Sequence, residues 1–220
     1  MLLLCCGCLL TAPGCNVVGF VTLLFAKVDA KHELTNRPTL VMVEDPETAL
    51  ANTALPDAIA TEIGQKLLEN GATHTVIDTN RLATLRNEMG DRFRKTPIDE
   101  IGRRVGAEQI IYVKVLTVII QNEPGMIKPS AVLAIKLVDA QTGERLFPNE
   151  STQFPVASPL STSDRTSYPL VINQRMEMVR EGATGTTDTI IRSKMAKVIA
   201  REIARLFYTH RPQIGEDVIE

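Results

Sequence analysis

The body of the chain lacks cysteine. Its four cysteines, Cys5, Cys6, Cys8 and Cys15, all fall within the first fifteen of 220 residues. The remaining residues can therefore form no disulfide with one another and supply no cysteine nucleophile or thiolate metal ligand. A cysteine-free body is compatible with an oxidising compartment, and it excludes cysteine-based catalysis.

Other groups typical of catalytic or metal sites are scarce. The three histidines, His32, His74 and His210, have no second His or Cys at ligand spacing, and no nucleophile motif accompanies His74. The segment Gly182 to Asp188 precedes a predicted helix but lacks the lysine of a phosphate-binding loop, so we interpret it as a loop with a helix cap. We expect no enzymatic activity, no metal and no cofactor.

The chain as a whole has no excess of positive charge. Its formal net charge is -2 and its sequence pI is about 6.0. Nucleic-acid-binding domains are typically basic, and anionic lipid surfaces also attract basic proteins. We therefore expect no nucleic-acid partner.

Charged residues are also absent from Leu2 to Ala26. As a helix this run of 25 residues would extend about 37 Å, which exceeds the roughly 30 Å of a bilayer's hydrocarbon core. One interpretation is an uncleaved transmembrane anchor, interrupted by Pro13 and followed by Lys27 and Lys31. Both this interpretation and the next place the chain at a membrane.

The second interpretation, which we favour, is lipidation. The segment from Leu10 to Cys15 ends an apolar run in small residues directly before a cysteine, and it resembles a bacterial lipoprotein signal peptide. The resemblance implies cleavage before Cys15 and acylation of this residue, so that residues 1–14 are a signal peptide and residues 15–36 a lipidated tether. Two or three acyl chains anchor a protein stably, whereas one binds only marginally.

The patterns that follow predict one α/β domain over residues 37–210, with residues 211–220 as a tail. Apolar runs bounded by Pro or Gly indicate buried strands, and apolar residues at helical spacing between capping signals indicate helices. The predicted strands are 39–45, Thr73–Thr79, Gln109–Ile120, Ala131–Ala140 and one near Arg145–Phe147; the predicted helices are Leu55–Asn70, one ended by Gly90, one capped by Thr96 with Pro97 at its first position and ended by Gly106, and Thr187–Tyr208.

Residues 148–169 are rich in Pro, Ser and Thr and predict an extended loop. Phe147, Phe154 and Tyr168 are candidate anchors for a partner protein, because exposed aromatic side chains in extended segments often carry binding energy. Packing of these rings back against the sheet is an equally good alternative.

The predicted C-terminal helix has an apolar stripe and a basic face. The basic face could contact anionic lipid or an acidic partner, although a solvated helix face is the interpretation that we favour. Its residues are Lys194, Lys197, Arg201 and Arg205.

Several strings between Thr39 and Phe147 carry a resemblance to a known family: LVMVED, QKLLENG followed by HTVIDTNRL, IDEIGRRVGAEQIIYVKV and IKLVDAQTGERLF. They resemble the fold shared by curli secretion-channel proteins, the lipoprotein activators of peptidoglycan synthases and the N-terminal domain of TolB. The resemblance implies an α/β fold in which helices flank a mixed sheet, with an antiparallel meander and a long C-terminal helix.

The same resemblance implies a place in the cell envelope, facing the periplasm and attached to the outer membrane. It implies an adaptor or activator that binds another envelope protein. The alternative is a subunit of an oligomeric secretion channel, which would make the chain a homo-oligomer. Because one fold hosts several functions, the resemblance implies the fold more strongly than the activity.

Overall fold

The computed structural model of the chain describes residues 26–123, 126–152, 160, 166–174, 176–177 and 187–212. The predicted signal peptide, the predicted lipidation site Cys15 and the candidate anchor Phe154 lie outside the described residues.

The predicted α/β class is confirmed, with helices flanking a mixed sheet and a long C-terminal helix. In chain order the elements are β1 (Thr39–Glu44), α2 (Leu55–Glu69), α3 (Thr79–Met89), the 3-10 helix η1 (Gly90–Lys95), α4 (Ile98–Val105), β2 (Gln109–Glu123), β3 (Met126–Asp139), β4 (Arg145–Phe147), β5 (Tyr168–Asn173), β6 (Met176–Glu177) and α5 (Thr187–Arg205).

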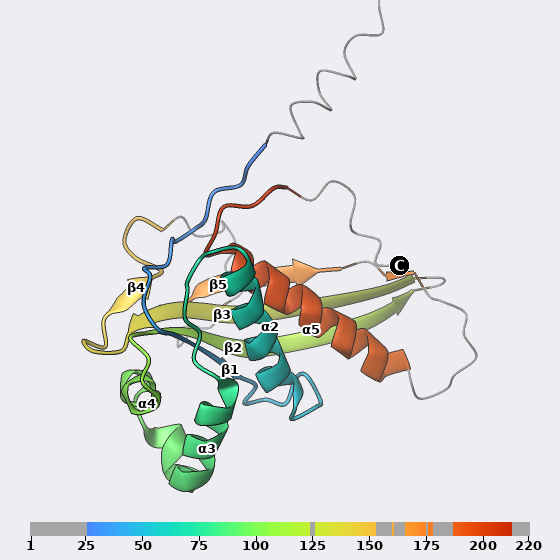
Figure 1. Cartoon of the computed structure of the whole chain (residues 1–220). Helices are drawn as coiled ribbons and strands as arrows, with labels where there is room; N and C mark the ends of the chain where they lie inside the picture. The colour runs from blue at the N-terminus through green and yellow to red at the C-terminus, as the bar shows by residue number, and fades with distance from the viewer. Residues whose placement is uncertain are drawn as a thin grey trace, which may run out of the picture.

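Six strands form one sheet around the long β2–β3 hairpin (Figure 1). β1 lies parallel to β2, and β2 pairs antiparallel with β3, with a register shift between Val115 and Thr117. The other edge of β3 pairs in turn with β4, β5 and β6. The predicted meander is therefore present, and β3 is its central strand.

Helices cover both faces of the sheet, because the strands are apolar on both faces. α2 and α5 pack side by side over one face, and α3 and α4 lie on the other (Figure 1). The α2–α5 core includes Ile63, Val113, Leu133 and Ile199, all 0% exposed. The described part of the chain contains no helix that is both long and apolar enough to cross a membrane.

The predicted strand Thr73–Thr79 is wrong. This segment meets the sheet through a single parallel bridge between Thr39 and Val76. The amide of Thr39 donates to the Thr75 carbonyl at 2.9 Å, and the amide of Ile77 donates to the Thr39 carbonyl at 2.8 Å. The chain then turns into α3 at Asp78, which leaves no length for a ladder.

The predicted cap of the third helix is also wrong. Pro97 occupies the N-cap position of α4, and the Thr96 hydroxyl instead donates to the Arg92 carbonyl at 2.9 Å, within η1. The predicted end of this helix is confirmed, because Gly106 adopts the left-handed conformation with a φ of 83°.

The strands reach further than their predicted bounds. Pairing in the β2–β3 hairpin continues to Glu123 and Met126, and the last two residues of the predicted loop, Tyr168 and Pro169, begin β5. Proline is tolerated there because β5 pairs with β3 alone among the described strands, and an edge strand can accommodate a missing amide donor.

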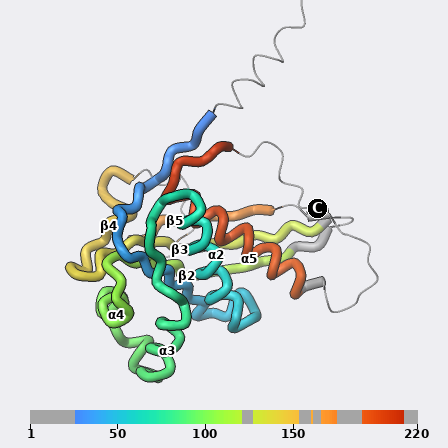
Figure 2. The backbone as a smooth tube through the Cα atoms, in the orientation of Figure 1, coloured from blue at the N-terminus to red at the C-terminus, as the bar shows by residue number. Residues whose placement is uncertain are grey.

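The described end of the predicted tether belongs to the domain. The amides of Val28 and His210 each donate to the other's carbonyl, at 2.8 and 3.0 Å. Those of Lys31 and His32 donate to the Leu206 carbonyl, at 2.8 and 3.0 Å. The first and last described segments therefore run side by side and leave the domain at one corner (Figure 2).

Candidate partner-binding groove between α3 and α4

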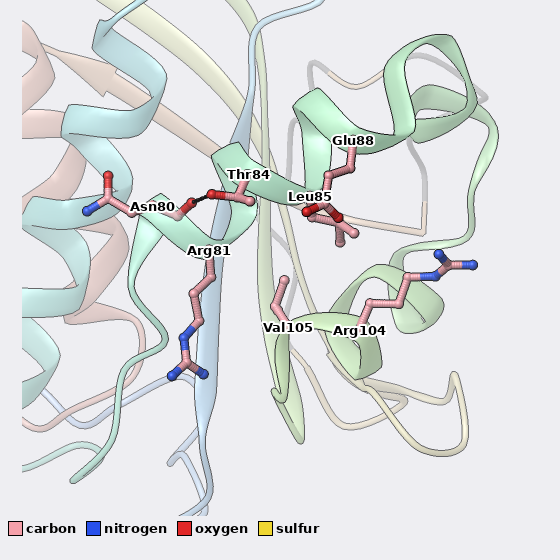
Figure 3. Close-up of a pocket in the computed structure, with 7 residues that line it drawn as sticks. All are labelled: Asn80, Arg81, Thr84, Leu85, Glu88, Arg104 and Val105. Carbon is pink, nitrogen blue, oxygen red and sulfur yellow. Dashed lines mark hydrogen bonds between the residues drawn. The ribbon is translucent and has the colours of Figure 1, made fainter.

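An open groove of about 360 Å³ lies between α3 and α4 (Figure 3). Its centre is apolar and its rim carries guanidinium, carboxylate, amide and hydroxyl groups. The lining residues are Asn80, Arg81, Thr84, Leu85, Glu88, Arg104 and Val105.

The start of α3 fixes the first wall of the groove. The Asp78 carboxylate accepts from the Asn80 amide at 2.8 Å and so caps the helix. From that start, helical spacing places Arg81, Leu85 and Glu88 on one face. Leu85 itself is 9% exposed and belongs to the core between α3, α4 and the sheet.

The second wall, α4, lies close against the sheet because Gly102 has no side chain. A Cβ built there would approach Ile110 Cδ1 to 2.4 Å and Ala140 Cβ to 3.2 Å. Ile101 and Val105 point into the same core as Leu85. Val105 therefore reaches the groove next to Leu85, and Arg104 stands beside it on the rim.

The two arginines of the groove differ in their surroundings. Arg104 donates to Glu100 Oε1 at 2.6 Å from Nη2 and 3.1 Å from Nε. No carboxylate of the described residues pairs with Arg81, which is exposed. The two side chains extend in different directions from the apolar centre formed by Leu85 and Val105 (Figure 3). This arrangement suits an amphipathic segment better than a small molecule that must be enclosed.

The two described candidate anchors do not lie at this groove. Phe147 is fully buried and Tyr168 is 6% exposed, so their packing against the sheet, the alternative interpretation, is what the structure shows. Ring centroids lie 5.1 Å apart for Phe147 and Tyr168, 5.9 Å for Phe147 and Phe207, and 5.8 Å for Phe147 and His32. Burial raises the pKa of Tyr168 and lowers the pKa of His32.

The predicted basic face lies on α5 but is not uniform. Lys197 is exposed and Lys194 is half-buried. Arg201 and Arg205 both donate to Glu202 Oε1, at 3.0 Å each, and their side chains are only 23% and 16% exposed. The arginine end of this face is therefore engaged in contacts within the domain.

A polar cluster closes one end of the sheet. Arg37 Nη1 donates to Asp139 Oδ2 at 2.8 Å, and Asp139 Oδ1 accepts from the amides of Gln141 and Thr142 at 2.8 and 3.0 Å. These bonds, that from Arg37 first, lower the pKa of Asp139 from 3.8 to about 2. Because each group has a partner within the domain, we assign the cluster a structural role.

No three His, Cys, Asp or Glu side chains gather as a metal site would require, as far as the described residues extend. The groove was not predicted from the sequence. Its lining residues are spread over two helices that are separated in the chain by η1, so no local pattern marks them.

No family model and no curated protein sequence matches the chain. Among solved structures, it is similar to lipoprotein GNA1162 from Neisseria meningitidis, with 10% identity, a TM-score of 0.40, and coverage of 74% of this chain and 99% of that one. It is also similar to the PelC dodecamer from Paraburkholderia phytofirmans, with 11% identity, a TM-score of 0.40, and coverage of 83% and 96%.

A third similar structure is the LpoB C-terminal domain from Salmonella enterica, with 15% identity, a TM-score of 0.36, and coverage of 66% of this chain and 88% of that one. Because all three TM-scores lie below 0.5, none of these likenesses supports a function.

Proposed function

We propose that the chain is a non-catalytic lipoprotein of the cell envelope that binds another envelope protein through the groove between α3 and α4. In this proposal Cys15 carries the lipid, and the domain faces the periplasm from the outer membrane. The chain positions or activates its bound partner and does not change it chemically.

The observation that carries the proposal is where the groove lies relative to the ends of the domain. Residues 26–32 leave at one corner beside the C-terminal segment, whereas α3 and α4 lie at the opposite end of the molecule (Figure 1). A domain held by its N-terminus would therefore present the groove away from the membrane. That is the orientation in which an anchored adaptor can reach a partner.

The anchor is tested by metabolic labelling with palmitate. Wild-type protein should incorporate label, and Cys15→Ala should abolish it, because the thiol is the proposed acylation site. Cys8→Ala, a change within the proposed signal peptide, is the matched control and should leave labelling intact. Unlabelled wild-type protein would refute lipidation.

The binding role is tested by cross-linking in intact membranes. A photo-reactive amino acid at Thr84, on the groove rim, should capture a discrete partner, and the same group at exposed Lys197 on α5 should not. Equal capture at both positions would contradict a groove-based adaptor. Capture of a second copy of this chain from Thr84 would indicate a homo-oligomer in its place.

A further inference from the structure

The part of the chain that forms the groove is basic. Residues 79–106, which make up α3, η1 and α4 and are here called the helical lobe, contain seven Lys or Arg and four Asp or Glu, a net charge of +3. Since the whole chain carries -2, the other residues together carry -5. The lobe is therefore a basic part of an acidic chain. α5 carries the same net charge, with five Lys or Arg and two Asp or Glu, and serves as the comparison.

The acidic residues of the lobe neutralise only part of this charge. Asp99 accepts from Arg103 at 2.9 Å and Glu100 from Arg104 at 2.6 Å. The other two acidic residues, Glu88 on the groove rim and Asp91 in η1, are exposed. Within the described part of the chain, four exposed basic side chains of the lobe have no carboxylate partner: Arg81, Arg92, Arg94 and Lys95. Their positive charges can therefore attract an anionic ligand that approaches the lobe.

The position of these side chains relative to the groove defines a pattern. Leu85 and Val105, 9% and 6% exposed, form the apolar floor of the groove, and Arg81 stands toward one end. η1, with Arg92, Arg94 and Lys95, joins the two helices next to the groove without lining it. Guanidinium groups bind carboxylates through paired, charge-assisted hydrogen bonds. A complementary ligand therefore combines an apolar side chain with flanking carboxylates.

We propose that the helical lobe binds an acidic, amphipathic segment of the partner protein, with an apolar side chain against Leu85 and Val105 and carboxylates against Arg81 and the basic residues of η1. The inference rests on the proposed function and names the chemistry of the partner that this groove recognises.

Two other anionic partners fit the structure less well. The lobe lies at the end of the molecule opposite the corner where residues 26–32 leave, so an N-terminal anchor would be attached at the other end of the domain. Single-stranded nucleic acid binds by stacking its bases on exposed rings. The aromatic residue of the lobe, Phe93, is 3% exposed and packs in the core beneath Arg86.

The test uses the full chain, purified in detergent, and two fluorescent synthetic helical peptides. One carries leucine on one face and glutamate beside it, and the other has glutamine in place of every glutamate. We expect fluorescence anisotropy to show binding of the glutamate peptide, weakening with added salt. The glutamine peptide should bind about tenfold more weakly or not at all, because it lacks the charge that the arginines recognise.

Charge-reversal variants locate the site. Arg81→Glu combined with Arg94→Glu should weaken binding of the glutamate peptide by about tenfold or more, with circular dichroism confirming that the fold is retained. The control, Lys197→Glu, reverses a single charge of the same sign on α5 and should bind within about twofold of wild type. As an independent readout, peptide-induced NMR shifts should fall on α3, η1 and α4.

Any of three results with the peptides would overturn the inference: equal binding of both peptides, no loss on reversing Arg81 and Arg94, or an equal loss with Lys197→Glu. Binding that depends on the lobe but occurs only with phosphatidylglycerol vesicles would identify a lipid ligand in its place. If photo-crosslinking from Thr84 still captures a partner when Arg81 and Arg94 are reversed, the adaptor function stands and the acidic-segment inference fails.

Discussion

At the scale of single residues, Gly102 controls how closely α4 approaches the sheet. We expect Gly102→Ala to lower the free energy of unfolding by about 1–3 kcal/mol, as inserting a methyl into packed core does. The reason is the contact of the new Cβ with Ile110 Cδ1 at 2.4 Å and with Ala140 Cβ at 3.2 Å. Urea denaturation measures the change.

The control is Asn87→Ala on the exposed surface of α3, which should change stability by no more than about 0.5 kcal/mol. If Gly102→Ala were as stable as wild type or more so, Ile110 would have to move aside freely, and the gain in helix propensity would outweigh the contact.

Asp139 makes stability depend on acidity. Its pKa is about 2 in the folded domain against 3.8 for the free group, so its contribution is fully present above pH 3.8 and is lost as the pH falls toward 2. Asp139→Asn should therefore be less stable than wild type near neutral pH, on the order of 1–3 kcal/mol for lost bonds to a charged group. The difference should shrink between pH 4 and 2 in denaturation curves.

Arg37→Ala removes the largest cause of the lowered pKa of Asp139. It should therefore make the stability of the domain depend less on pH between 4 and 2. A difference between Asp139→Asn and wild type that stays constant from pH 4 to 2 would show that the charge of Asp139 contributes nothing to folding.

At the scale of elements, the start of α3 depends on one cap. Asp78→Ala should destabilise the domain by about 1 kcal/mol, because the Asn80 amide loses its acceptor at 2.8 Å. Asp78→Ser retains a capping oxygen and should recover most of the loss. Thermal denaturation measures the stability of both variants. If the two variants are equally stable, the cap is unimportant.

Helices were predicted better than strand edges, and the reason is local. α2 begins and α4 ends at signals carried by neighbouring residues, namely Pro56 after Leu55 and the left-handed Gly106. Strand pairing depends on distant partners. Thr73–Thr79 looks like a strand but finds only one bridge, whereas the segment containing Pro169 looks like a loop but pairs with β3.

The burial of the aromatic side chains could not be predicted from the sequence either. Phe147 lies beside a Pro- and Ser-rich segment, which favours exposure, yet its ring packs against His32 and Phe207 from the two ends of the described chain. The groove escaped prediction for the same reason, since Leu85 and Val105 meet only when α3 and α4 pack on one face of the sheet.

At the scale of the whole molecule, the two described ends are joined. The Val28 amide donates to the His210 carbonyl, so ending the chain after Tyr208 removes its acceptor. We expect hydrogen exchange of the Val28 amide to become faster in that variant, because only hydrogen-bonded amides are protected. The amides of Lys31 and His32, bonded to Leu206, serve as the internal control and should exchange as in wild type.

Unchanged exchange at Val28 would mean that the Val28–His210 bridge does not persist in solution. Faster exchange at all three amides would mean that the bridge stabilises the whole N-terminal segment rather than its first residue.

The bridge between Val28 and His210 also determines how the domain responds to mechanical load. If the N-terminus is attached to a membrane as proposed, tension would pass from Val28, Lys31 and His32 into the segment that follows α5, through their backbone hydrogen bonds. The strain is therefore taken up by the α2–α5 layer before it reaches β1. The helical lobe lies on the other face of the sheet and outside this path, so a partner held there could remain bound while the anchor is pulled.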